Sequence, residues 1–200
     1  MLFSHFRQIA ACEKSRTRRS GVSRLQRYAF LPLGKEREMK GKRHMNPATV
    51  LDLVNVFFAG MLAGIEFVIH YGLRAPAEVL DEQSQIQLRQ ALVLRLRVLV
   101  PAFFIPTAVS GIAVTIIDGG APGFWLRCAG VLAVLIWISI RIIGTVPINS
   151  ATLTWQPSAP PKNWKALVNH AERFHIVGVW AVVLAFALFL TAMALKLAAS

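Results

Sequence analysis

Long apolar segments, separated by shorter polar ones, make up most of the chain after residue 45. Two of them, residues 98–117 and 176–195, are each 20 residues long and contain no Asp, Glu, Lys or Arg. About 20 residues of α-helix cross a hydrocarbon core of about 30 Å. We therefore predict a membrane domain over residues 46–197 with four spanning helices, at about residues 47–73, 96–117, 124–148 and 175–196.

The polar segments between these spans complete the predicted fold. After residues 75 and 76, leucines and isoleucines alternate with charged residues, which predicts a short interfacial helix that runs into span two. Three prolines and the indoles of Trp155 and Trp164 predict an irregular loop before span four, with both rings at the membrane surface. The predicted fold class is an all-α integral membrane four-helix bundle. Span four is apolar on every side, so we expect it to face lipid.

The charge of the chain is concentrated in its first 45 residues. The whole chain is 55% hydrophobic and only 16% charged, with a mean hydropathy of +0.52 and a formal net charge of +12. Residues 1–45 hold 12 of the 22 Lys and Arg residues. The remainder is nearly balanced, so nucleic-acid binding has no support in the membrane domain. We interpret residues 1–45 either as a basic leader that lies on anionic lipid or as sequence upstream of a true start at Met45.

The orientation in the membrane depends on that choice. With the leader present, the positive-inside rule places both longer loops outside the cytoplasm. Without it, the bases near the two longer loops outnumber Arg127 and Lys196 on the other side, and the same rule places both loops inside. We favour the second arrangement, in an integral, multi-pass protein of a bacterial inner membrane.

The first span carries a polar stripe. On a helix, Asp52, Asn55, Glu66 and His70 fall within about 80° of the surface. Because ionised groups facing lipid cost roughly 2.5–3.5 kcal/mol even on mild scales, the stripe must face protein or a cavity. Asp52 lies about 21 Å from Glu66 along the axis, so we expect Asp52 to neighbour Asn55 and Glu66 to pair with His70 four residues on. Either end can instead be a scaffold contact near a membrane surface.

A second group of polar residues precedes span four. His170, Glu172 and His175 lie close together in the sequence. Their spacing, even when combined with that of Glu66 and His70, matches no standard metal-ligand motif. We therefore predict no metal site and expect His175 to point into the mouth of the bundle.

Several of these features together resemble the anthrone-oxygenase-like family of four-helix membrane proteins. The resemblance covers about residues 46–195 and is carried by the small-residue first span, by the Pro-Ile-Asn sequence that ends at Asn149, by Trp155, and by Trp164, Glu172, Arg173 and His175 before span four. Gly178 stands where that family often has an arginine.

The resemblance implies a reaction in which O₂ oxidises an anthrone to an anthraquinone without metal or flavin. Such a site needs a base, a donor for a developing oxyanion and a slot for a flat substrate. On this reading the catalytic residues are His70 as the base, oriented by Glu66, together with His175, and with Asn149 as the hydrogen-bond donor. Trp155, Trp164, Asn55 and Asp52 are substrate-binding candidates.

Two other classes of function remain open. The Glu66–His70 stripe would also suit a proton relay in a small transport or channel protein. Alternatively, Gly60 and Gly64 beside the stripe would let a partner helix approach a non-catalytic membrane subunit closely. The expected partners are the lipid bilayer, an aromatic small molecule and further copies of the chain.

Overall fold

The computed structural model describes residues 46–199, so the predicted basic leader lies outside the described residues. Within them the chain forms α-helices joined by short turns, and two helices continue into a π-helical turn. The π-helical turns are η2 (Val68–Gly72) and η3 (Arg141–Thr145). The α-helices are α2 (Pro47–Phe67), α3 (Arg74–Glu78), α4 (Glu82–Ile117), α5 (Phe124–Ile140), α6 (Val146–Thr152) and α7 (Trp164–Ala198).

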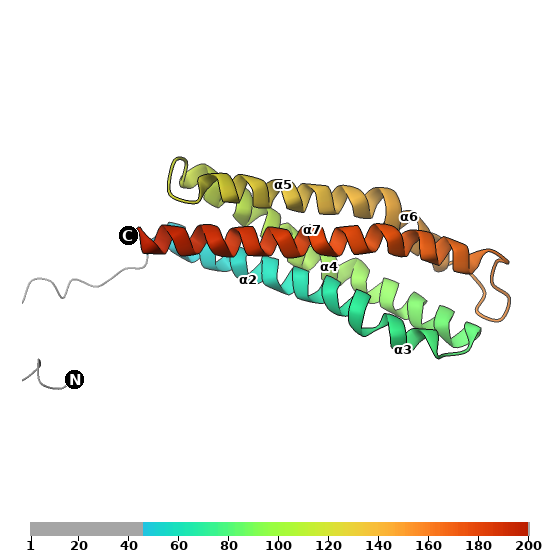
Figure 1. Cartoon of the computed structure of the whole chain (residues 1–200). Coiled ribbons are helices and arrows are strands. Elements are labelled where there is room, and N and C mark those ends of the chain that lie inside the picture. The colour runs from blue at the N-terminus through green and yellow to red at the C-terminus, as the bar shows by residue number, and fades with distance from the viewer. Residues whose placement is uncertain (1–45, 200) are drawn as a thin grey trace, which may run out of the picture. The chain divides into compact units, whose positions relative to one another are not determined.

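Four helical segments are long and apolar enough to cross a membrane: Pro47–Glu78, Glu82–Ile117, Phe124–Thr152 and Trp164–Ala198. They run up and down in turn, with α2 packed against α4 and α7, and α5 packed against α7 and α4 (Figure 1). The start of α2 and the end of α7 lie at one end of this bundle, and α3 and the loop before α7 lie at the other. The protein is an all-α, integral, multi-pass membrane protein, which confirms the predicted fold class.

Local sequence explains where the helices begin. The Asn46 side chain accepts a hydrogen bond from the Ala48 amide at 3.1 Å, and Pro47 occupies the first turn, where its missing N–H costs nothing. Asp81 caps α4 in the same way through the Ser84 amide at 3.0 Å, and the Ser84 hydroxyl and amide together lower the pKa of Asp81. Each cap supplies an acceptor to an amide that has no partner inside the helix.

Glycine at position 123 allows the turn into α5. Its φ of +85° is one that residues with a side chain rarely adopt. A Cβ at this position would also lie 2.8 Å from the backbone oxygen of Ala192 in α7. Both facts explain why α5 can begin directly against the last turns of α7.

The second span is longer than the sequence pattern predicted. Helix α4 runs unbroken for 36 residues and contains Pro101 and Pro106. The predicted interfacial helix is its first part, continuous with the membrane-spanning part. At 1.5 Å per residue, α4 is about 54 Å long, which exceeds the thickness of the hydrocarbon core.

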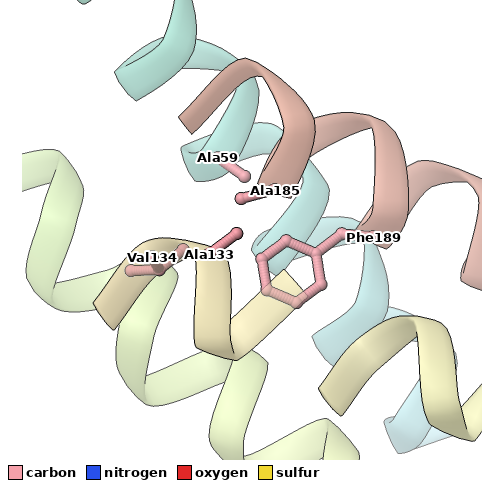
Figure 2. Packing of buried hydrophobic residues seen from close by; sticks show 5 residues of the cluster. All are labelled: Ala59, Ala133, Val134, Ala185 and Phe189. Carbon is pink, nitrogen blue, oxygen red and sulfur yellow. The ribbon is translucent and has the colours of Figure 1, made fainter. Parts of the chain in front are cut away.

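The apolar core corrects the expectation for span four. Residues of α2, α5 and α7 form one tightly packed cluster, in which Phe189 lies against Ala59, Ala133, Val134 and Ala185 (Figure 2). A second cluster contains Leu62, Trp137 and Val182, all fully buried. Helix α7 therefore packs against two neighbours along a buried face. The uniformly apolar sequence concealed this face because lipid and protein core select the same side chains.

Trp155 in the loop before α7 and Trp164, the first residue of α7, are both buried against protein, and their place at the membrane surface stays a prediction. Trp155 is 9% exposed and Trp164 is 7% exposed, and both pack in one cluster with Ile86 of α4. The Gln90 side chain donates hydrogen bonds to the Trp155 carbonyl at 2.9 Å and to the Thr152 carbonyl at 3.0 Å. The loop is thereby fastened onto the first part of α4.

Candidate functional site

The bundle contains two buried polar clusters. The terminal cluster, at the end where α2 begins and α7 ends, consists of Asp52, Asp118, Arg127 and Lys196. The loop-side cluster, toward α3 and the loop before α7, consists of Glu66, His70, Arg89, Arg141, Glu172 and His175. Each contains two carboxylates and two bases of the Lys or Arg type, so each is close to charge neutrality. The two apolar clusters of the core lie between them.

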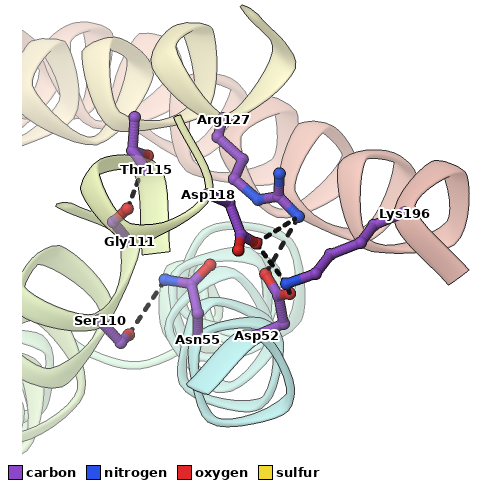
Figure 3. Close-up of polar contacts among 8 residues, drawn as sticks. All are labelled: Asp52, Asn55, Ser110, Gly111, Thr115, Asp118, Arg127 and Lys196. Carbon is purple, nitrogen blue, oxygen red and sulfur yellow. Dashed lines mark hydrogen bonds and ion pairs between the residues drawn. The ribbon is translucent and has the colours of Figure 1, made fainter. Parts of the chain in front are cut away.

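The terminal cluster joins four helical segments (Figure 3). Lys196 of α7 donates a hydrogen bond to Asp52 of α2 at 2.8 Å and also contacts Asp118 at the end of α4. Arg127 of α5 lies 3.3 Å from Asp52 and 3.5 Å from Asp118. Asp52 therefore makes its ion pairs with residues of other helices and not with its expected neighbour Asn55.

Asn55 also acts between helices. Its amide nitrogen donates to the Thr107 carbonyl at 2.9 Å and to the Ser110 hydroxyl at 3.1 Å, both on α4. Asn55 and Asp52 thus lie in contacts that hold the helices together, at the opposite end of the bundle from the histidines.

Glu66 is bound by Arg141, not by His70. The Arg141 NH1 atom lies 2.8 Å from each oxygen of the Glu66 carboxylate, and Glu66 is fully buried. The guanidinium also lies over the ring of Trp137, with its Cζ 5.6 Å from the ring centroid. The predicted pairing of Glu66 with His70 is wrong, because a charged partner from another helix occupies the carboxylate.

Each histidine faces a glutamate of the other helix. The His175 Nδ1 atom on α7 lies 3.5 Å from Oε2 of Glu66 on α2. The His70 Nδ1 atom in η2 lies 3.4 Å from Oε2 of Glu172 on α7. The two rings lie side by side with centroids 5.5 Å apart. Two carboxylate–imidazole pairs therefore connect α2 and α7 crosswise.

Arg89 completes the loop-side cluster from α4. Its NH2 atom donates to Asn149 Oδ1 at 2.9 Å, and its NH1 atom lies 3.6 Å from Glu172 Oε1. Asn149 is thus next to the cluster, as the sequence predicted, but its carbonyl oxygen is occupied by Arg89. Neither Arg89 nor Arg141 was among the site residues predicted from the sequence.

Two residues of the loop-side cluster come from π-helical turns. His70 lies in η2 and Arg141 is the first residue of η3. A π-helical turn inserts one extra residue, which rotates the following side chains, and such turns are frequent at functional sites. Two of them, on separate spans, contribute to the same buried cluster. We take this as the main structural sign that the loop-side cluster has a function beyond packing.

One regularity in the sequence could have revealed the partners of the stripe. Asp52 and Glu66 are 14 residues apart in α2, and their partners Arg127 and Arg141 are also 14 residues apart. Spans one and three run in the same direction, so equal spacing places both pairs at matching heights.

Two adjoining cavities lead to the loop-side cluster. The outer cavity has a volume of about 370 Å³ and lies between η2, α3, α4 and α7. The inner cavity has a volume of about 70 Å³ and reaches Arg141, Thr145, Asn149 and His175. Four residues line both of them, namely Ile69, Arg89, Leu92 and Glu172. The outer volume is within the range of small-molecule sites in proteins.

Of the two tryptophans predicted to stack against a substrate, one lines the outer cavity and the other packs behind it. Trp164 lines the outer cavity together with leucine, isoleucine and valine side chains of three helices. Trp155 packs with Trp164 against Ile86. Among residues 46–199, no group of three or more His, Cys, Asp or Glu side chains is placed to hold a metal ion together.

Comparison of the chain with known proteins gives no assignment. No protein-family model, no curated protein and no solved structure matches it.

Proposed function

We propose that the protein is a cofactor-independent oxygenase of a bacterial inner membrane that acts on a flat aromatic or polyketide-like substrate. The proposal rests on the resemblance noted in the sequence and on one structural observation. His175 lines the inner cavity, its Nδ1 atom faces the Glu66 carboxylate at 3.5 Å, and its Nε2 atom is buried without a hydrogen-bond partner. A carboxylate that orients one imidazole nitrogen leaves the other nitrogen available as a base.

The chemistry requires only a base, O₂ and an acidic C–H bond. His175 removes a proton from the methylene carbon of an anthrone-like substrate, and the resulting anion transfers one electron to O₂. The carbon radical and superoxide then combine to form a C–O bond, and the protonated product is a hydroperoxide. Loss of the second C–H proton and cleavage of the O–O bond give a ketone and one water molecule. Each turnover consumes one O₂.

The two cavities suit the binding of the ring system and the reaction at its methylene carbon. A polycyclic ring system fits the volume of the outer cavity, where Trp164 offers a flat surface for stacking. The ring would then lie at the mouth of the inner cavity, with its methylene carbon within reach of His175. In this proposal the base is His175 with Glu66 as its orienting group, so the role of base first given to His70 passes to His175.

A continuous proton relay across the membrane is a weaker alternative. The titratable groups of the described residues gather at the two ends of the bundle, and the apolar clusters around Ala59 and Leu62 lie between them. A relay needs donors and acceptors along its whole length. The region between the two clusters supplies apolar side chains in their place.

The test is oxidation of anthrone by purified protein in detergent, followed as O₂ consumption and as anthraquinone absorbance. We expect wild-type protein to exceed the rate of autoxidation, and His175→Ala to lose activity by about 100-fold or more, as is usual for a general base. His170→Ala is the matched control, because His170 is exposed on the same helix.

Wild-type protein that leaves the autoxidation rate unchanged would refute the proposed function. Full activity in His175→Ala would refute the assignment of the base. Equal losses in His175→Ala and His170→Ala would point to a general effect of altering α7 and would count against His175 as well.

A further inference from the structure

The inner cavity is lined by three side chains with unpaired buried polar atoms. Arg89 Nε, Thr145 Oγ1 and His175 Nε2 have no hydrogen-bond partner, and all three residues line this cavity. An unpaired buried polar atom is destabilising, and such atoms are uncommon in folded proteins. Three around one small cavity indicate that a bound group completes their hydrogen bonding.

No carboxylate oxygen of the cluster pairs with Arg89 Nε or Thr145 Oγ1. Both oxygens of Glu66 accept from Arg141. The two oxygens of Glu172 face Arg89 NH1 at 3.6 Å and His70 at 3.4 Å. The remaining N–H of Arg89 and O–H of Thr145 are therefore donors in excess. A site with excess donors, one of them cationic, favours a ligand atom with negative charge.

Size limits what can enter. The inner cavity of about 70 Å³ holds roughly two water molecules at about 30 Å³ each, and it is too small for a ring system. Its shared walls with the outer cavity allow one molecule to occupy both. The body of such a ligand would lie in the outer cavity, with a single oxygen atom in the inner one.

We propose that the inner cavity is an oxyanion site, in which Arg89 and Thr145 donate hydrogen bonds to the anionic oxygen of a ring-conjugated enolate or phenolate. This inference rests on the proposed function, because the substrate anion formed there carries its charge on such an oxygen. Asn149 then has a different task from the one predicted. Its carbonyl oxygen holds Arg89 NH2 at 2.9 Å and so positions the guanidinium.

A stable phenol can test the site without any turnover. The probe is 4-nitro-1-naphthol, whose absorbance distinguishes phenol from phenolate, and 1-nitronaphthalene serves as the comparison compound without a hydroxyl. Binding is measured in detergent at the pH where the probe in empty micelles is half ionised. We expect the wild-type protein to raise the ratio of phenolate to phenol about tenfold, which corresponds to about 1.4 kcal/mol.

Three variants locate the effect. Thr145→Val keeps the size of the side chain and removes one donor, and Arg89→Gln removes the cation, so both should reduce the phenolate ratio at least threefold. Arg95→Gln, at an exposed position of the same helix, should leave the ratio unchanged. Circular dichroism of each variant checks that the helices remain, and the Thr145→Val result stands even if Arg89→Gln does not fold.

The inference is overturned if the probe binds as the neutral phenol, if it does not bind, or if Thr145→Val retains the full phenolate ratio. These outcomes are independent of the oxidation assay. Protein that ionises the probe but leaves anthrone oxidation at its background rate would keep the oxyanion site and refute the proposed function alone.

Discussion

Glu66 shows how a charged residue is accommodated inside this bundle. It is fully buried, and its carboxylate is held by Arg141 at 2.8 Å from both oxygens. Taking an ion out of water costs several kcal/mol, which only close, well-oriented partners offset. The pair is therefore not a large net source of stability, but either partner alone would be a strongly destabilising group.

This predicts a specific pattern of stability. Glu66→Gln should lower the free energy of unfolding by about 3–5 kcal/mol, because it leaves the Arg141 guanidinium buried without its counter-charge. The double variant Glu66→Leu with Arg141→Leu should recover most of that loss. Thermal or denaturant unfolding in detergent micelles measures both.

Glu78→Gln is the control, since it removes an exposed ion pair with Arg74. Such pairs contribute at most about 1 kcal/mol, so this variant should unfold near wild type. A double variant as unstable as Glu66→Gln itself would show that the cost lies in lost packing and not in the unpaired charge.

For single residues, the sequence predicted whether a side chain is buried better than it predicted which residue that side chain contacts. The polar stripe of span one is buried and faces protein, as the helical angles required. The predicted partner of Glu66 was wrong, because spacing along one helix identifies only neighbours on that helix, whereas Arg141 lies on another span. The burial of Trp155 and Trp164 was missed for a similar reason, since their contact with Ile86 depends on how the loop folds back.

Among the helical elements, the two π-helical turns are the least regular and the most closely linked to the site. Gly144 lies in η3, where it packs against Phe174 of α7, and a Cβ at this position would overlap the Phe174 ring. The absence of a side chain at Gly144 thus allows η3 to approach α7. That approach sets the position of Arg141, three residues earlier.

We predict that Gly144→Ala displaces η3 and destabilises the protein by about 1–3 kcal/mol, the usual cost of overpacking. It should also lower the oxidation rate, because Arg141 would move relative to Glu66. Gly64→Ala is the matched control, since nothing lies within 4 Å of a Cβ there and alanine favours helix over glycine by about 1 kcal/mol. Unfolding and activity measurements on both variants provide the check, and equal behaviour of the two would contradict this role of η3.

The number of spanning helices could be predicted from the lengths of the apolar segments alone, because the thickness of the bilayer sets the length of a spanning helix. The ends of the helices could not. Helices α4 and α7 extend well beyond their charge-free segments, since their first parts carry polar residues on exposed faces while still packing against neighbours. A π-helical turn leaves no clear mark in the sequence, so η2 and η3 could not have been expected.

For the whole molecule, the loop-side cluster lies near one edge of the hydrocarbon region. His175 immediately precedes the charge-free segment of α7, and α4 extends past that level toward Glu82. The outer cavity is therefore formed partly by helical segments that project from the membrane. A hydrophobic substrate dissolved in the bilayer could reach it without crossing bulk water.

The distribution of exposed bases predicts the orientation. In the described part of the chain, the loop side carries exposed Arg74, Arg95, Arg97, Lys162, Lys165 and Arg173. On the other side, Arg127 and Lys196 are engaged by Asp52 and Asp118. Counted over these residues alone, without residues 1–45, the positive-inside rule predicts that the loop side faces the cytoplasm. Alkaline phosphatase fused after Ser200 should be active, and a reporter that needs the cytoplasm should be inactive there and active when inserted at residues 157–161.

The equal spacing of the two ion pairs between spans one and three also constrains which insertions and deletions the sequence can accept during evolution. Asp52–Arg127 and Glu66–Arg141 are two ion pairs that connect spans one and three at two fixed heights along the helix axes. One residue inserted between Asp52 and Glu66 in span one would move one of the two carboxylates by about 1.5 Å along the helix axis and rotate it by about 100°, away from its arginine. Length changes in the two spans are therefore coupled. Related chains should keep the same interval in both spans, even where the apolar residues between the pairs have been replaced.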